Sequence, residues 1–162
     1  RLKTRLFLQK QFMLRLSLGY PSVEDEVAIM ENQQYTHPIE ELGPVATSAE
    51  VLDLQTVVRT IFVDDLVKQY IASLVAATRQ NVSIYLGASP RGSLALFRTS
   101  QAMALLSGRD YVLPDDVKVL AEPVLAHRLI VRSTDHSREK SVKALLSQLL
   151  ETVTVPGTIV SR

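Results

Sequence analysis

The residues with the most chemical character are Gly87-Ala88-Ser89-Pro90-Arg91-Gly92. Serine followed by proline is typical of a helix start, because serine can cap free N–H groups and proline needs no hydrogen-bond donor at the first helical position. Arg91 then lies in the first turn, where the helix dipole disfavours another positive charge. The same positive end, the free N–H groups and a guanidinium together suit a bound anion. The spacing therefore predicts either an anion site at Arg91 or an arginine that extends into solvent.

Arg98 follows Arg91 by seven residues, which places it about two turns later on roughly the same helix face. There it could support Arg91 or pair with an acidic side chain. Arg109-Asp110 is expected to form a local turn pair after a glycine. His127-Arg128 is expected at a helix end, where positive charge suits the helix dipole.

A complete catalytic site cannot be read from the sequence. It contains no G-x-x-x-x-G-K-[ST] loop for phosphates, no apolar strand ending in paired acids for magnesium, and no G-x-S-x-G elbow for a nucleophile. Three histidines without any cysteine make a zinc site improbable and exclude a disulfide. His37 and His136 are far apart in the sequence. The paired acids fit helix starts better than a metal site: Asp64-Asp65 and Asp115-Asp116.

The composition is that of one globular domain of 162 residues. Its 18 basic and 17 acidic side chains leave a formal charge of +1, which gives no electrostatic reason to bind nucleic acid or an anionic membrane. No apolar run approaches the roughly 20 residues of a membrane span, and residues 1–11 show no cleavable signal pattern. We expect a cytoplasmic location. Because no methionine begins the sequence, we also expect a fragment or a truncated gene product.

The first part of the chain contains one strand candidate and one helix candidate. Phe12–Leu18 is the strand candidate, and it stops at Gly19-Tyr20-Pro21, where proline cannot continue a ladder. Ser22 and Asp25 have the spacing of an approximate capping box, which predicts a helix from that point. Tyr35–Thr47 contains two prolines and a glycine without periodicity, so it is expected to be a connector.

Every strong signal after the connector is helical. The predicted helix starts are Ser48, Asp64, Ser89-Pro90 and Pro114, and a last helix is expected with Arg138, Lys140 and Lys143 off its apolar face. Four helices carry apolar residues at the 3–4 spacing of one buried face. Representative members are Val51, Leu54, Val57 and Val58 after Ser48; Val67, Tyr70, Ile71, Leu74 and Thr78 after Asp64; Val117, Leu120 and Val124 after Pro114; and Val142, Leu145, Leu146, Leu149 and Leu150 in the last helix. The helix after Ser89 is apolar around most of its circumference, ends at Gly108, and is expected to be central, whereas Pro123 predicts a kink. The predicted fold class is all-α, a helical bundle behind one strand.

The longest motifs resemble the lid of MoxR-family AAA+ proteins. They are Gly87–Arg91 and Ala102–Val117, which reads AMALLSGRDYVLPDDV. Three shorter stretches are similar to the family as well: Leu16–Ser22, Thr78-Arg79 and Leu125–Leu129. The resemblance extends from about Phe12 to Pro156, nearly the whole chain.

The resemblance implies a role in ATP hydrolysis. In that family a P-loop core precedes this segment, and the lid folds over the nucleotide. Arg91 would be the sensor-2 arginine that touches the terminal phosphate, with Ser89, Pro90 and Arg98 beside the nucleotide. ATP and Mg²⁺ would be bound mainly by the core, so this chain alone should be inactive. The parent is expected to be a hexameric, chaperone-like ATPase whose lid contacts its own core, neighbouring subunits and a client protein. Arg109-Asp110 would then be an alternative candidate for a lid–core contact.

The expected parts are a remnant of the core (1–21), a linker helix and connector (22–47), the helical lid (48–156) and a tail (157–162). A hinge is expected at Gly19–Ser22 or in the connector. At Gln11 the family usually has an arginine that could act on a neighbouring subunit's ATP, and glutamine cannot supply that charge, although Lys10 could replace it in part. The rival interpretation is a non-catalytic helical interaction module whose motifs reflect ancestry alone.

Overall fold

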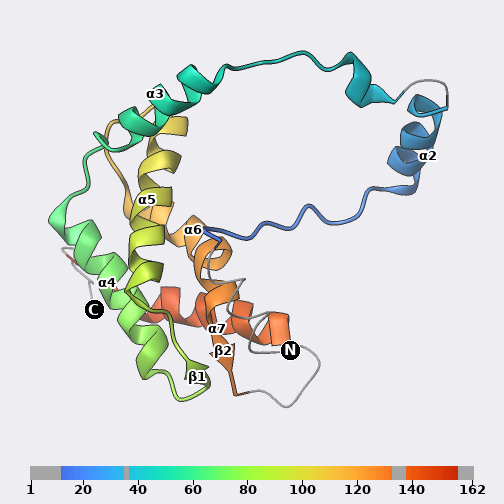
Figure 1. The fold of residues 1–162 in the computed structure, drawn as a ribbon. Helices are drawn as coiled ribbons and strands as arrows, with labels where there is room; N and C mark the ends of the chain where they lie inside the picture. The colour runs from blue at the N-terminus through green and yellow to red at the C-terminus, as the bar shows by residue number, and fades with distance from the viewer. Residues whose placement is uncertain (1–11, 35–36, 133–137, 157–162) are drawn as a thin grey trace. The chain divides into compact units, whose positions relative to one another are not determined.

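The computed structural model describes residues 12–34, 37–132 and 138–156 (Figure 1). The chain divides into two compact units. The smaller unit is Leu16–Gln55, and the larger unit combines the residues before and after it. No helix among the described residues combines the length and the apolar character that a membrane crossing requires.

The smaller unit contains helix α2, Val23–Asn32, which begins as the sequence predicts. Ser22 Oγ accepts a hydrogen bond from the N–H of Asp25 at 3.1 Å, and the Ser22 N–H donates to the Asp25 carboxylate at 3.3 Å. This reciprocal pair satisfies two N–H groups that a helix start otherwise leaves without partners. The connector that follows contains a short 3₁₀ helix, η1, Pro38–Glu41, which was not predicted.

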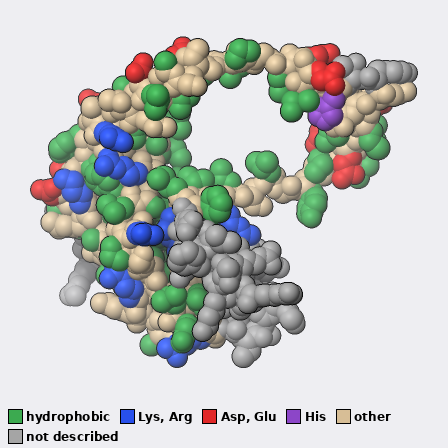
Figure 2. Space-filling model, in the orientation of Figure 1, with side chains coloured by type: hydrophobic (Ala, Val, Ile, Leu, Met, Phe, Trp, Pro, Cys, Tyr) green, Lys and Arg blue, Asp and Glu red, His purple; other side chains and the backbone are tan. Residues whose placement is uncertain are grey.

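Helix α3, Ser48–Val58, differs from the sequence prediction in two ways. Its cap is Thr47 rather than Ser48, because Thr47 and Glu50 have the spacing of a capping box: Thr47 Oγ1 accepts from the Glu50 N–H at 3.2 Å, and the Thr47 N–H donates to Glu50 at 2.7 Å. No residue of α3 is buried, so its predicted core stripe is exposed or half-buried. Figure 2 shows hydrophobic side chains along the surfaces of α2 and α3. Periodicity marks which face of a helix could be buried, but not what covers it.

The larger unit is the predicted helical bundle, and the all-α fold class is confirmed. Its helices are α4 (Asp65–Gln80), α5 (Pro90–Leu106), α6 (Pro114–Leu125) and α7 (Arg138–Thr152). Every residue of the predicted α4 stripe is buried, and in α7 Val142, Leu146 and Leu149 are buried. Helix α5 packs against both α4 and α6. It is less enclosed than predicted, because Leu94 and Leu106 are exposed.

The bundle also contains a small antiparallel sheet that was not predicted. Strand β1, Ile84–Leu86, pairs with β2, Ile130–Val131, in the register Ile84 with Val131 and Leu86 with Ile130. Helix α6 continues past Pro123 to Leu125 and then tightens into a 3₁₀ turn, η2, Ala126–Arg128, which leads into β2. The sheet therefore joins the end of α6 to the loop that precedes α5.

The expected strand over Phe12–Leu18 is not a strand in the structure. A strand is defined by pairing with a neighbour, and no described residue forms a ladder with this segment. Residues 12–15 instead lie beside α6 (Figure 1), where the Arg15 N–H donates to the Pro123 carbonyl at 2.9 Å.

Candidate functional site at the start of helix α5

The loop before α5 is held by a buried threonine at the end of α4. Thr78 is fully buried, and its hydroxyl donates to the Val75 carbonyl at 2.7 Å. The same oxygen accepts a hydrogen bond from the N–H of Ala88 at 3.0 Å. Because both bonds use one hydroxyl, the position of Ala88 is fixed relative to α4. The residues that begin α5 follow directly after this anchor.

Gly87 brings the loop into direct contact with the backbone of α4. A Cβ atom added to Gly87 would lie 2.7 Å from the Thr78 carbonyl oxygen and 2.8 Å from Arg79 Cα. Real Cβ atoms do not approach backbone this closely. A glycine is therefore required here for close approach, which is one of the reasons for glycine at turns near ligand sites. Thr78-Arg79 and Gly87-Ala88, which the sequence showed as separate motifs, form one joint.

Helix α5 starts at the predicted position, and its first turn has the chemistry of an anion site. Ser89 is the N-cap residue and Pro90 is the first helical residue. The Ser89 side chain makes no capping hydrogen bond, and the first turn contains no acidic residue. Ser89, Pro90 and Arg91 are all exposed. The start of α5 thus offers the Ser89 hydroxyl and the Arg91 guanidinium to solvent, with no carboxylate in the turn to neutralise the positive charge.

Arg98 is not placed beside Arg91. Its guanidinium donates to Gln101 Oε1 at 3.0 Å and lies 5.4 Å from the centre of the Phe97 ring. Gln101 in turn donates to the Ile61 carbonyl at 2.8 Å. Seven residues along a helix correspond to about 10 Å of rise. Arg98 is therefore held by residues of its own helix, whereas the predicted support of Arg91 by Arg98 has no hydrogen bond or ion pair behind it among the described residues.

A second arginine, Arg128 at the end of η2, lies near the start of α5 instead. Its side chain is buried, and its Cδ lies 3.9 Å from where a Cβ at Gly92 would be. Burial lowers the pKa of Arg128 from its ordinary value, and the nearby charge of Arg91 lowers it further. From the sequence, His127-Arg128 was expected only to lie at a helix end. That role is partly right, because Arg128 Nε donates to the Val124 carbonyl in the last turn of α6 at 2.9 Å.

His127 contacts the first described residues of the chain. Its Nε2 lies 3.0 Å from the Phe12 carbonyl and donates to it, while Nδ1 is buried without a hydrogen-bond partner among the described residues. Burial lowers the pKa of His127, and the charges of Arg128 and Arg15 act in the same direction, against the hydrogen bond to Phe12. His127 therefore favours the neutral ring, whose single proton is on Nε2.

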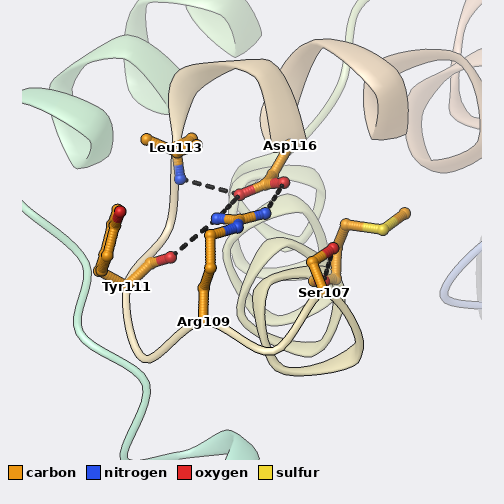
Figure 3. A network of polar contacts seen from close by, with 6 residues as sticks. Ser107, Arg109, Tyr111, Leu113 and Asp116 are labelled. Atoms are coloured by element: carbon orange, nitrogen blue, oxygen red, sulfur yellow. Dashed lines mark hydrogen bonds and ion pairs between the residues drawn. The ribbon is translucent and has the colours of Figure 1, made fainter.

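The expected Arg109-Asp110 pair is wrong, because Arg109 binds Asp116 (Figure 3). The two nitrogens of the guanidinium donate to the two carboxylate oxygens at 2.9 and 2.7 Å, and one of them also donates to the Tyr111 carbonyl at 3.0 Å. Asp116 further accepts from the Leu113 N–H at 2.8 Å at the start of α6. Two parallel bonds suit a planar guanidinium better than a contact with its own neighbour in sequence. Asp116 is thus more than a helix-start acid.

Replacing Asp116 with alanine should destabilise the larger unit by about 1.5–3 kcal/mol, because three hydrogen bonds to a charged group are lost. Burial alone would raise the pKa of Asp116, but the bonds from Arg109 and Leu113 outweigh it, so the pKa lies below its ordinary value. A lowered folded-state pKa adds stability above the ordinary carboxyl pKa of about 4, and this part is lost as the pH falls below it.

Urea unfolding of the wild type and Asp116→Ala at pH 7 and pH 3 tests this expectation. The difference between the two proteins should shrink at pH 3. Asp115→Ala is the matched control, because Asp115 is exposed and forms a surface ion pair with Lys118. An Asp116→Ala protein as stable as the Asp115→Ala control would contradict the assigned role.

The remaining candidate residues have local roles. Asp64 caps α4 by accepting from the Leu66 N–H at 2.8 Å, and Asp65 pairs with Lys68. His37 accepts from the Ile39 N–H, and His136 lies outside the described residues. Gln11 and Lys10 also lie outside them.

Comparison with known proteins places these features in one family. A family model for the AAA lid domain matches residues 76–149, which include the Thr78–Ala88 joint, Arg91 and the Arg109–Asp116 pair. The chain is 40% identical to the uncharacterized protein YeaC of Bacillus subtilis over 146 residues, covering 90% of this chain and 46% of YeaC. It is 31% identical to chaperone MoxR1 of Mycobacterium tuberculosis, covering 90% of this chain and 41% of MoxR1.

A solved structure agrees with the sequence matches. The crystal structure of a predicted ATPase from Cytophaga hutchinsonii superposes with a TM-score of 0.79 at 25% identity, covering 93% of this chain and 48% of that protein. The chain therefore spans less than half the length of each of these relatives. The chain is similar to the C-terminal portion of the MoxR-family AAA+ ATPases, and its residues 76–149 match the AAA lid domain.

Proposed function

We propose that the chain is the sensor-2 lid of a MoxR-type AAA+ ATPase and that Arg91 touches the terminal phosphate of ATP. The observation that carries this proposal is the placement of Arg91, exposed in the first turn of α5 with no acidic residue in that turn. An arginine is unfavourable at a helix start unless an anion compensates it. The AAA lid match over the same residues supports ATP as the source of that anion.

The donors at the start of α5 fit a phosphate. Arg91 can give two parallel N–H bonds to phosphate oxygens, and Ser89 adds a hydroxyl that α5 does not use for capping. No group of three or more His, Asp or Glu residues suited to a metal occurs in the described part of the chain. We therefore assign no residue here to Mg²⁺, which a P-loop core would hold in the whole protein.

Arg91 would contribute mainly to the transition state. Negative charge builds on the phosphate oxygens as the terminal phosphoryl group is transferred, so a guanidinium already in place strengthens its bonds at that moment. Such placement requires a rigid support. The Thr78–Ala88 hydrogen bond and the contact of Gly87 with α4 supply it, because they fix the start of α5 to the rest of the bundle.

The lid would also transmit the state of the nucleotide. Rotation of the bundle as a rigid body on a P-loop core would change contacts with neighbouring subunits, as in other hinge transitions. We propose a hexameric ring in the cytoplasm with a chaperone-like action on a client protein, in keeping with the name of the relative MoxR1. The exposed apolar side chains of α2 and α3 favour a second candidate function, protein binding without catalysis.

The isolated chain should not hydrolyse ATP, because it contains neither a phosphate loop nor a magnesium-binding strand end. Purified chain incubated with Mg-ATP should release phosphate no faster than buffer in a phosphate-release assay. The same chain joined to a MoxR-type P-loop core should hydrolyse ATP, and this activity should depend on Arg91. The proposal is contradicted by turnover of the isolated chain that survives repurification and disappears when one of its own residues is replaced.

A further inference from the structure

The Arg128 guanidinium holds a segment that is more than a hundred residues away in the sequence. Its NH2 group donates to the carbonyl of Phe12 at 2.8 Å and to that of Met13 at 3.2 Å. His127 donates to the same Phe12 carbonyl at 3.0 Å. The Arg15 N–H then closes the contact by donating to Pro123 of α6. Residues 12–15 are therefore attached to α6 and η2 through their backbone.

These contacts do not depend on which side chains residues 12–15 carry. In these four hydrogen bonds the segment contributes backbone groups: the Phe12 and Met13 carbonyl oxygens accept, and the Arg15 N–H donates to α6. The specificity of the attachment comes from Arg128 and His127, both of which are about nine-tenths buried. A buried guanidinium that loses its acceptors is costly, so the attachment should be well populated.

The aliphatic part of the Arg128 side chain lies near the start of α5. Arg128 Cδ lies 3.9 Å from the Cβ position of Gly92, the residue after Arg91. The two positive charges also affect one another, because the charge of Arg91 contributes to lowering the pKa of Arg128. The Arg128 side chain thus binds residues 12 and 13 and also lies near the turn that carries Arg91.

We propose that Arg128 is a positioning residue that couples the attachment of residues 12–15 to the charge state of the α5 start. The coupling to nucleotide rests on the proposed function. Repulsion between the two guanidinium groups weakens the hold of Arg128 on Phe12 and Met13. An anion bound at Arg91 offsets that repulsion and tightens the attachment. Because coupling is reciprocal, a firm attachment must favour the anion equally. Residues 12–15 would then respond to phosphate without touching it.

The coupling can be tested on this chain without any nucleotide. Arg91→Gln removes the repelling charge and Arg91→Glu reverses it, so both should slow hydrogen exchange of the Arg15 amide. We expect roughly a twofold to tenfold effect, larger for glutamate, which is the size of a partly screened charge interaction. Arg98→Glu is the matched control, because it makes the same charge change on the same helix where Gln101 and Phe97 hold the side chain. Arg128→Lys should speed Arg15 exchange, since a point charge cannot replace the fork.

A second set of measurements uses tripolyphosphate as the probe. In the wild type it should slow Arg15 exchange, and in Arg128→Lys this response should be lost while the global melting temperature of the variant still reports a folded bundle. The coupling is overturned if the Arg15 amide of the Arg91 variants exchanges at the same rate as in the wild type or in Arg98→Glu. This holds even where tripolyphosphate binds. If the Arg91 variants slow exchange but tripolyphosphate binds equally well to Arg91→Glu, the coupling stands and the proposed phosphate site fails.

Discussion

Replacing Arg91 with alanine in the ATPase that contains this lid should lower ATP hydrolysis by roughly tenfold to a thousandfold, while ATP affinity falls less. In the proposed mechanism other groups would hold most of the ground-state phosphate, whereas Arg91 would meet the charge that the transition state gains. The expected loss is smaller than that for an arginine finger supplied by a second subunit, because Arg91 would be one of several positive groups around the phosphate. Hydrolysis rate, nucleotide affinity and melting temperature should be measured on the same preparations.

Two further variants and one control measurement make this result specific. Arg91→Lys should restore only part of the activity, since an ammonium lacks the planar pair of donors. Arg98→Ala should have a smaller effect than Arg91→Ala, because Arg98 is held by Gln101 along the helix. Melting temperatures should hardly change in Arg91→Ala, as its removal relieves an unfavourable dipole contact. Full activity in Arg91→Ala, or a loss that simply follows unfolding, would favour the interaction-module interpretation.

The helix starts could be predicted because their signals are local. Ser22 and Asp64 each begin a helix at the expected residue, since each accepts a hydrogen bond from an N–H within three residues. Ser89-Pro90 also begins a helix where expected, with proline at the first helical position and no capping bond from the serine. The same locality explains the wrong cap of α3. Thr47 and Ser48 are both good capping residues, and only the position of Glu50 three residues after Thr47 decides between them.

The small sheet and the long-range polar contacts could not be predicted in this way. Strands β1 and β2 are two or three residues long and far apart in the sequence, so neither shows a period. Arg109 has an acidic neighbour in sequence, but the turn before α6 brings Asp116 into a better geometry. The partners of Arg128 depend on a backbone contact with Phe12 and Met13, which carries no side-chain signal at all.

The candidate site was predicted only as far as its first turn. Arg91 was predicted from the order of residues around Ser89-Pro90, and Arg98 was predicted either to support it or to pair with an acidic side chain. In the structure the start of α5 is held by Thr78 and Gly87, which belong to different elements and meet because the loop turns back onto α4. Gly87 did carry a signal, since a glycine just before a helix cap can mark a close approach of the backbone.

Gly87→Ala should therefore disturb the site without touching Arg91. The new Cβ would meet the Thr78 carbonyl oxygen and Arg79 Cα, and since these are backbone atoms, the loop or the end of α4 must move. Overpacking of this kind costs about 1–3 kcal/mol of folding stability. The movement should also weaken the Thr78–Ala88 hydrogen bond, so the start of α5 loses its fixed position. Urea unfolding should report the first effect, and hydrogen exchange of the Ala88 amide should report the second.

Gly43→Ala is the matched control for this variant. Nothing lies within 4 Å of a Cβ at Gly43, so the same methyl group should leave stability unchanged or raise it by a few tenths of a kcal/mol, because alanine restricts the unfolded chain. In the whole ATPase, Gly87→Ala should lower the hydrolysis rate while Arg91 is still present, since an arginine displaced by an ångström no longer meets the developing charge. A Gly87→Ala protein with wild-type stability and wild-type protection of Ala88 would show that the loop adapts freely, and rigid support of Arg91 by α4 would then have to be abandoned.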